Sequence, residues 1–321
     1  MVGSVIVANG KIIGEGWHQK NGTAHAEVNA INSVAEADKH LLKESTIYVS
    51  LEPCAHFGKT PPCANLIVET GIPNVVIACT DPFSKVNGKG IAILEKASVN
   101  VIHGVLENEG INLIKRFVTF HNKKRPYIIL KWAESTDGFM GKSDEQVWLS
   151  NGLCKQLSHK WRTEEAVILV GENTVLTDNP NLTARAWQGK NPVRIAFQKH
   201  QLFPAKSNIF NLEADTILFT QLAEQKVPEQ HNKVLISSEI DNFIPTVLNY
   251  LFEQNLTSLI VEGGKKVLQS FIEKNLWDEA RIFKTDVILN AGIIAPNLKM
   301  QPTKSLKLDK HLLETYYNMG A

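Results

Sequence analysis

The chain has 321 residues, of which 43% are hydrophobic and 21% are charged, and its formal net charge at pH 7 is +1. These values are ordinary for a globular protein, and the length suits two domains. The near-neutral balance gives no basic footprint for nucleic acid, and no apolar run reaches the roughly 18–20 residues that span a bilayer. The first residues lack the basic start of a signal peptide, so we expect a cytoplasmic protein.

Short strands alternate with helices in the first part of the chain. A hairpin is predicted at the start, because Asn9-Gly10 separates two β-rich runs and both residues tolerate the positive φ of a type I′ turn. The elements predicted next are helices at 24–37, 63–70, 90–97 and 107–122 and strands at 46–51, 74–78 and 100–103. This alternation is typical of an α/β layer fold.

A basic stretch that ends in proline, Lys123-Lys124-Arg125-Pro126, follows the last of these helices and predicts a domain boundary. A second α/β series begins after it, with strands at 127–132, 166–170, 194–197, 215–220, 234–236 and 258–261 and helices at 155–164, 246–254 and 265–274. We therefore predict two domains, at residues 1–122 and 126–321.

The strongest chemical signal combines one histidine with two neighbouring cysteines in the first domain. Four cysteines are too few for a disulfide scaffold in a chain of this length, and a close pair favours a metal site or catalysis. A catalytic zinc takes three nitrogen or sulfur ligands from the protein and leaves its fourth position to water. His25, Cys54 and Cys63 are therefore the predicted zinc ligands.

Glu27 is the predicted proton carrier beside that zinc. H-x-E followed by P-C and a second cysteine is the pattern of zinc deaminases, in which the glutamate is a general acid and base but not a ligand. Within a helix, His25 and Glu27 would face apart, so we expect His25 at the helix start. After Pro62, Cys63 is expected in the first turn of a helix, where free N–H groups favour a thiolate.

The spacing of the cysteines departs from the usual pattern, because eight residues instead of two separate Cys54 from Cys63. This wide segment, with its His, Gly, Lys, Thr and two Pro residues, resembles the bifunctional deaminase/reductase family of riboflavin biosynthesis. The resemblance covers nearly the whole chain, in the family's domain order. Other segments that carry it are His25-Ala26-Glu27-Val28, Asp81-Pro82, Asp137-Gly138, Leu169-Val170-Gly171, Asp178-Asn179-Pro180 and Val261-Glu262-Gly263-Gly264.

The resemblance implies an α/β chain with a cytidine-deaminase-like three-layer domain followed by a dihydrofolate-reductase-like domain. The first domain would hydrolyse an amino group from 2,5-diamino-6-(5-phosphoribosylamino)pyrimidin-4(3H)-one, using Zn²⁺, which lowers the pKa of water toward ~7. The second would reduce the ribosyl side chain to ribityl with NADPH. The partners implied are this phosphorylated pyrimidine and a second copy of the chain in a homodimer. The charge and the lengths of the apolar runs predict no nucleic acid and no membrane as partners.

In the second domain the residues alone indicate less about chemistry. No G-x-G-x-x-G follows the first strand, so an ordinary Rossmann domain is not expected. Gly263-Gly264 lies between a predicted strand and a predicted helix, where free N–H groups can hold a cofactor diphosphate. A tight turn without a ligand is the alternative.

The resemblance also implies site residues at matching positions. Those for the substrate are His56, Lys59, Asp81, Gln146, Arg162, Leu182, Arg185 and Glu262. Those for NADPH are Ala133, Trp148, Thr174, Asp178, Gly264, Lys265, Lys266, Val267, Leu268, Gln269 and Ser270. Arg162 and Arg185 could clamp the phosphate as guanidinium forks. Lys131 and Asp178 are the candidates for polarising or protonating the sugar oxygen, although Lys131 could also serve only in an ion pair and Asp178 only to orient the site.

Three other interpretations stay open. A nucleoside or RNA-base deaminase with an unrelated second domain is one, and the +1 balance speaks against its RNA form. A structural zinc protein is another, which would need a fourth ligand, with Cys79 the nearby candidate. The third is a reductase with an impaired deaminase domain. It is suggested by the lack of the family's first helix before Met1. Two other departures replace family residues, Phe83 at a polar substrate contact and Gln198-Lys199 at a cofactor contact of the second domain.

Overall fold

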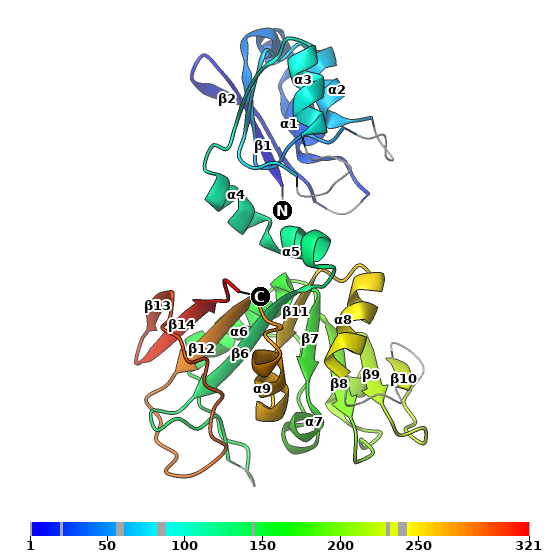
Figure 1. Ribbon diagram of the computed structural model, residues 1–321, viewed down its shortest axis with the longest axis vertical. Coiled ribbons are helices and arrows are strands. Elements are labelled where there is room, and N and C mark those ends of the chain that lie inside the picture. The colour runs from blue at the N-terminus through cyan, green and yellow to red at the C-terminus, as the bar shows by residue number, and fades with distance from the viewer. Residues whose placement is uncertain are drawn as a thin grey trace. The chain divides into compact units, whose positions relative to one another are not determined.

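The chain is divided into two compact units, Met1–Lys123 and Lys124–Ala321, each with its own sheet and core (Figure 1). The computed structural model describes residues 2–19, 22–55, 61–81, 88–142, 145–228, 232–236 and 243–320. None of the helices in these ranges is long and apolar enough to cross a membrane.

The first unit is built on one mixed sheet with the strand order β2-β1-β3-β4-β5. Its strand β1 runs antiparallel to both neighbours, whereas β3, β4 and β5 run parallel. Helices α1, α2 and α3 share one apolar core with the buried side of this sheet (Figure 1). The elements in chain order are β1 (Gly3–Ala8), β2 (Lys11–Trp17), α1 (Ala26–Ser33), the 3-10 helix η1 (Glu36–Glu44), β3 (Thr46–Val49), α2 (Cys63–Thr70), β4 (Asn74–Ile77), α3 (Lys89–Lys96), β5 (Asn100–His103), α4 (Glu107–Leu113) and α5 (Lys115–Lys123).

The predicted hairpin turn is confirmed, because Asn9 and Gly10 have φ values of 50° and 73°. The predicted helix at 24–37 was too long. It ends at Ser33, and Val34 takes an extended conformation that places its side chain in the core. The predicted helix at 107–122 is divided into α4 and α5 at Ile114, which is 3% exposed.

The second unit is built on a nine-stranded sheet with the order β10-β9-β8-β7-β11-β6-β12-β14-β13. The strands from β10 to β12 are parallel, and β14 and β13 add an antiparallel edge. The elements are β6 (Tyr127–Glu134), α6 (Gly152–Glu164), β7 (Val167–Val170), α7 (Glu172–Asp178), β8 (Val193–Gln198), the 3-10 helix η2 (Asn208–Phe210), β9 (Thr216–Thr220), β10 (Asn232–Ile236), α8 (Phe243–Glu253), β11 (Ser258–Val261), α9 (Lys265–Glu273), β12 (Glu279–Lys284), β13 (Lys304–Leu308) and β14 (His311–Tyr317).

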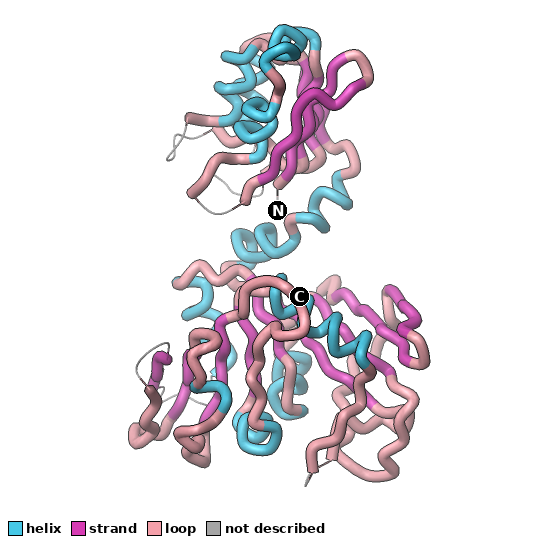
Figure 2. The backbone as a smooth tube through the Cα atoms, turned by 180° about the vertical axis from the view of Figure 1, so that it is seen from behind, coloured by secondary structure: helices cyan, strands magenta, loops and turns pink. Residues whose placement is uncertain are grey.

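Helices cover both faces of this second sheet, as the opposite views in Figures 1 and 2 show. Helices α8 and α9 pack with Ile128 and Leu130 on one face, whereas α6 and α7 pack with Tyr127 and Ile129 on the other. Because both faces are buried, the central strands are almost continuously apolar. The carboxyl ends of the parallel strands meet at one edge, where α/β sheets bind their ligands.

The start of the second unit is fixed by a buried ion pair. The guanidinium of Arg125 donates to both carboxylate oxygens of Asp278, over 2.6 and 3.0 Å, and both residues are 6% exposed. Asp278 also accepts the N–H of Ile128 at 2.8 Å. These bonds tie the beginning of β6 to the residue that precedes β12.

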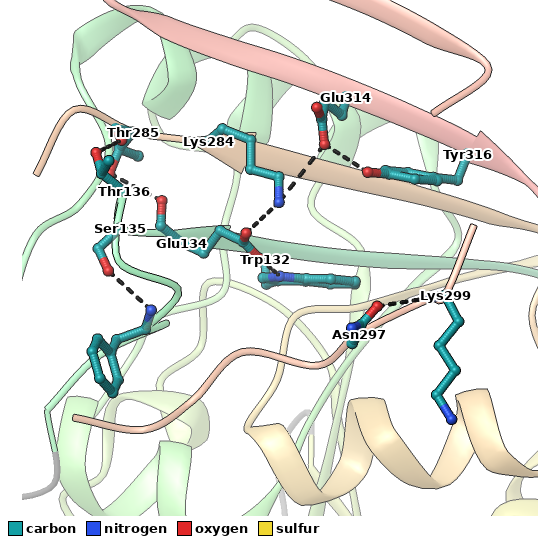
Figure 3. Close-up of polar contacts among 11 residues, drawn as sticks. Trp132, Glu134, Ser135, Thr136, Lys284, Thr285, Asn297, Lys299, Glu314 and Tyr316 are labelled. Carbon is teal, nitrogen blue, oxygen red and sulfur yellow. Dashed lines mark hydrogen bonds and ion pairs between the residues drawn. The ribbon is translucent and has the colours of Figure 1, made fainter. Parts of the chain in front are cut away.

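Strand β12 carries charged side chains that are neutralised in pairs. Glu279 accepts hydrogen bonds from Tyr127 Oη at 2.9 Å and from Arg281 Nε at 2.6 Å, and all three side chains are buried. At the other end of the strand, Lys284 pairs with Glu134 and lies 3.8 Å from a carboxylate oxygen of Glu314 (Figure 3). The sequence pattern did not predict this strand.

Candidate active sites

The three predicted zinc ligands meet at one point of the first unit. His25 is the N-cap residue of α1, with φ −71° and ψ 168°, so it lies at the helix start as predicted. Cys63 is the first residue of α2, and Cys54 lies in the segment between β3 and α2. Their ligand atoms all lie within 4.8 Å of one another.

The donor atoms suit zinc in kind and in spacing. His25 Nδ1 lies 3.5 Å from the sulfur of Cys54 and 3.3 Å from that of Cys63. Zinc bonds of about 2.0–2.3 Å at tetrahedral angles place ligand atoms roughly 3.5 Å apart. Hydrogen bonding from Cys63 lowers the pKa of the Cys54 thiol to about 4, which favours a thiolate. Among the described residues, Cys79 is not part of this group, and its sulfur donates to Ser50 O at 3.2 Å.

Glu27 lies in the first turn of α1, beside the metal-binding group, and is 3% exposed. Burial raises the pKa of its carboxyl group to about 7, and Cys54, His25 and Cys63 are the charged or hydrogen-bonding groups that it faces. A buried carboxyl group with a pKa near neutrality can both take up and release a proton.

Two glycines of β2 allow helix α1 to lie directly on that strand. A Cβ atom on Gly16 would lie 2.3 Å from Ala30 N and 2.6 Å from Ala26 O, and one on Gly14 would lie 2.5 Å from Ala30 O. These neighbours are backbone atoms and cannot turn aside. The close packing therefore sets the position of the N-terminal end of α1, where His25 and Glu27 lie.

Replacing Gly16 by alanine is expected to destabilise the first unit by about 3 kcal/mol, because overpacking against backbone has no rotamer to relax into. Zinc content and deaminase activity should fall, whereas activity of the second unit should stay. Zinc analysis and urea unfolding measure this. Gly3→Ala in β1 is the control, since nothing lies within 4 Å of its Cβ position. Equal effects of the two variants would contradict this explanation.

Of the substrate residues expected in the first unit, the structure describes Asp81, which is 8% exposed. Its peptide N–H donates to Glu52 Oε2 at 3.2 Å. His56 and Lys59 lie outside the described residues, as does Phe83. No motif in the sequence predicts a role for Glu52, and its one sequence signal is its position two residues before Cys54.

In the second unit, a buried carboxylate joins two cations from different elements. Glu262 follows β11 and accepts two hydrogen bonds from Arg162 of α6, over 2.9 and 2.7 Å. Lys131 Nζ, on β6, lies 3.7 Å from Glu262 Oε2. The side chains of Glu262, Arg162 and Lys131 are 7%, 13% and 14% exposed. The family resemblance implies these three residues separately, and the structure brings them together.

The charges in this cluster control one another. Burial alone would raise the pKa of Glu262, but Arg162 and Lys131 hold it at about 2. Burial lowers the pKa of Lys131, and Glu262 opposes that effect. The third contact of the Arg162 guanidinium is a hydrogen bond to Thr183 O at 3.0 Å. Because Arg162 is engaged in this way, its pairing with a substrate phosphate stays a prediction, whereas Arg185 is exposed.

The predicted strand–glycine–helix junction is present at the carboxyl end of β11. Gly171, which follows the neighbouring β7, donates its N–H to Gly263 O at 2.9 Å. A Cβ on Gly264 would lie 3.3 Å from Thr174 Oγ1, so this junction lies against the first turns of α7. Free N–H groups at the start of α9 suit a cofactor diphosphate. Leu268 is fully buried, so its side chain belongs to the core.

The other reductase positions singled out in the sequence do not form a comparable hydrogen-bonded cluster among the described residues. Trp148 is 68% exposed, with Lys155 Nζ 5.8 Å from its ring centre. Gln146 and Asp178 are exposed. Gln198 is fully buried, where it accepts a hydrogen bond from Thr220 and donates one to Gln225. The amide group of Gln198 is therefore hydrogen-bonded inside the second unit. The remaining expected positions are Ala133 on β6, the buried Leu182, and Lys265, Lys266, Val267, Gln269 and Ser270 on α9.

His159, on the same helix as Arg162, predicts an effect of pH on stability. Burial, with the charges of Arg162 and Arg185, lowers its pKa from 6.5 to about 4. The unfolded chain therefore takes up this proton at a higher pH, and stability falls as pH drops from 6.5 toward 4. Between pH 7 and 5 the loss should be about 2 kcal/mol. Urea titrations followed by tryptophan fluorescence measure the unfolding free energy at each pH. The His159→Gln variant should lack the part of the pH-dependent loss that comes from His159. An unchanged pH dependence in the variant would contradict the assignment.

Known proteins resemble both units. The second matches the RibD C-terminal domain over residues 126–314, and the first matches the cytidine and deoxycytidylate deaminase zinc-binding region over residues 1–79. The riboflavin biosynthesis protein RibD of Aquifex aeolicus is 36% identical over 324 residues, which cover 99% of this chain and 89% of that protein. The chain belongs to the RibD family. RibD of Escherichia coli is 31% identical, with 90% of this chain and 82% of the relative covered.

Solved RibD structures resemble the whole chain as well. A Thermotoga maritima diaminohydroxyphosphoribosylaminopyrimidine deaminase/5-amino-6-(5-phosphoribosylamino)uracil reductase superimposes with a TM-score of 0.88 and 34% identity, covering 98% of this chain and 90% of the other. RibD of Acinetobacter baumannii gives 0.84 and 27%, with coverages of 98% and 91%. This chain is thus a bifunctional RibD deaminase/reductase with an intact zinc-binding triad and a reductase domain that implies NAD(P)H. The RibD match in the second unit is contrary to the alternative of an unrelated second domain.

Proposed function

We propose that the chain deaminates 2,5-diamino-6-(5-phosphoribosylamino)pyrimidin-4(3H)-one in its first domain, residues 1–122, and reduces the product's ribosyl side chain with NADPH in its second, residues 126–321. The observation that carries this proposal is the convergence of His25, Cys54 and Cys63 beside buried Glu27 in a RibD chain. The named activities of the Thermotoga relative support the choice of substrate.

In deamination, the residues of the first domain are proposed to bind the metal and the substrate, to exclude bulk water and to transfer protons. His25, Cys54 and Cys63 would hold Zn²⁺, which would make a water molecule acidic enough to attack the ring at neutral pH. Glu27 is proposed to take one proton from the attacking water and deliver it to the ring, and then to pass a second proton, from the hydroxyl group added to the ring carbon, to the amine as its bond to that carbon breaks. Burial of Glu27 keeps the transferred protons from bulk water, and its carboxyl pKa of about 7 suits both proton transfers. Asp81, His56 and Lys59 are proposed to hold the substrate.

In reduction, NADPH supplies the hydride equivalent, and the protein supplies orientation and a proton donor. Lys131 is proposed to donate to the sugar oxygen, while Glu262 keeps its ammonium charged against the effect of burial. Asp178 is the second candidate for this role. The first turns of α9 are proposed to hold the cofactor diphosphate, and Arg185 the substrate phosphate. We further propose that the protein is cytoplasmic and forms a homodimer.

Removing zinc tests whether deamination depends on the first domain's metal site and reduction does not. After treatment with a chelator, ammonia release from the diaminopyrimidine ribosyl phosphate should stop and should return when Zn²⁺ is added. NADPH oxidation with separately prepared deaminated substrate should be unchanged throughout. If reduction also stops, or if ammonia is released from free cytidine in preference, the proposal fails. No ammonia from the zinc-loaded protein, with reduction intact, would favour the impaired-deaminase alternative.

A further inference from the structure

Glu52 is a buried acidic residue that lies close to the zinc site without belonging to it. It lies two residues before Cys54 and is 3% exposed, and the group of potential metal ligands does not include it. Its carboxylate accepts hydrogen bonds from four backbone N–H groups, so both oxygens are satisfied inside the protein. These donors are Asp81 and Gly88 to Oε2, at 3.2 and 3.0 Å, and Gly90 and Ile91 to Oε1, at 2.9 and 3.4 Å.

The four donors come from the two ends of the connection between β4 and α3. Asp81 follows β4, and Gly88 is the N-cap residue of α3. The N–H groups of the first helical turn have no partner within their own helix, and a carboxylate is the side chain best suited to them. The N-cap residue Gly88 has no side chain and cannot cap the helix itself. Glu52 therefore supplies the cap of α3 from another part of the chain.

A close backbone contact fixes the same junction independently. A Cβ atom on Gly90 would lie 2.0 Å from the carbonyl oxygen of Pro53, the residue between Glu52 and Cys54. The start of α3 thus lies directly on the peptide that leads to a zinc ligand. Carboxylate and glycine together join the segment that carries Cys54 to the segments that carry Asp81 and the start of α3.

We infer that Glu52 is a positioning residue for deamination. It holds Asp81 and the first turn of α3 at a fixed distance from Cys54, and so aligns the substrate side of the site with the metal side. Among the described residues it is not one of the potential metal ligands, and it acts through the backbone segments that its carboxylate binds. The inference rests on the proposed deamination in the first domain, with Asp81 on the substrate side.

A Glu52→Gln variant tests the inference, because an amide of the same size loses the charge and one of the two acceptor oxygens. Zinc content and the reductase rate should be unchanged. The KM for the pyrimidine substrate should rise about tenfold or more, since small misplacements of binding groups are costly. The kcat should change by less than about threefold, as expected when binding rather than chemistry is affected. Glu95→Gln, at an exposed position of α3, is the matched control.

Two outcomes overturn the inference: a KM equal to that of the control with zinc retained, or a loss of activity that follows zinc loss while the loaded fraction keeps its KM. The unaltered protein and a Glu27→Gln variant, measured in parallel, distinguish a failure of this inference from a failure of the proposed function. If the unaltered protein releases no ammonia, the proposed function fails; if it does, and Glu52→Gln matches it, only the inference fails.

Hydrogen exchange on the unaltered zinc-loaded protein provides a second test that needs no variant to fold. The amides of Asp81, Gly88, Gly90 and Ile91 should exchange slowly, at rates like those of the neighbouring strands. Exchange of these four amides at the rate of exposed loops would show that the carboxylate does not hold them, and would overturn the inference.

Discussion

Replacing Glu27 by glutamine is expected to reduce the kcat of deamination by about 10³-fold, in the range typical for a lost general acid and base. Glutamine keeps the size of the side chain and removes the proton that the buried carboxyl group carries near neutral pH. Because Glu27 belongs to the first unit, NADPH oxidation with deaminated substrate should be unchanged. Ammonia release and NADPH oxidation, measured on one preparation, give both values.

The control for this variant is Glu69→Gln, at an exposed position on α2, the helix that begins with Cys63. Zinc content must be measured for both, because a glutamine that displaced the metal would imitate the loss of a proton carrier. A Glu27→Gln protein with full zinc and more than about a tenth of the original kcat would mean that another group carries the proton.

Replacing Glu262 by glutamine is expected to lower the unfolding free energy of the second unit by about 3–5 kcal/mol, as seen when one partner of a buried ion pair is removed. The variant leaves Arg162 and Lys131 buried without their shared anion. Reductase kcat/KM should fall by about two orders of magnitude, because Lys131 loses the contact that orients it. Urea unfolding and NADPH oxidation measure the two effects, and deamination should continue.

The sign of the pH effect at Glu262 gives a further check on this variant. The folded pKa of about 2 lies below the ordinary 4.5, so the group stabilises the fold above pH 4.5 and loses this contribution as pH falls toward 2. That part of the acid destabilisation should be absent in Glu262→Gln. Glu253→Gln, exposed near the end of α8, is the control. If the control lost as much stability as Glu262→Gln, the buried cluster would not be its cause.

The sequence was sufficient to predict the zinc site because the signals there are local. His25 is the N-cap residue of α1 and Cys63 begins α2, and proline before the cysteine marks that helix start within a few residues. The hairpin at Asn9-Gly10 was predictable for the same reason, since two adjacent residues determine the turn.

Other features depend on partners far away in the chain and could not be predicted. Strand β12 contains Glu279 and Arg281 at buried positions, and these charges are acceptable because each has a partner, which no alternation of apolar residues reveals. Glu262 and Arg162 are 100 residues apart, and their pairing follows from the fold. The cap that Glu52 provides for α3 is likewise a contact between segments that no local motif marks.

The Arg125–Asp278 pair also determines where the two activities can be separated by cutting the chain. A protease that cleaves before Lys124 would release a reductase fragment that keeps both partners of this pair. Cleavage after Arg125 would leave Asp278 as a buried carboxylate without its cation, at a cost of several kcal/mol. A gene fragment for an independent reductase should therefore begin at or before Lys124. Gene fission that kept this junction with the second unit would leave the Arg125–Asp278 pair intact.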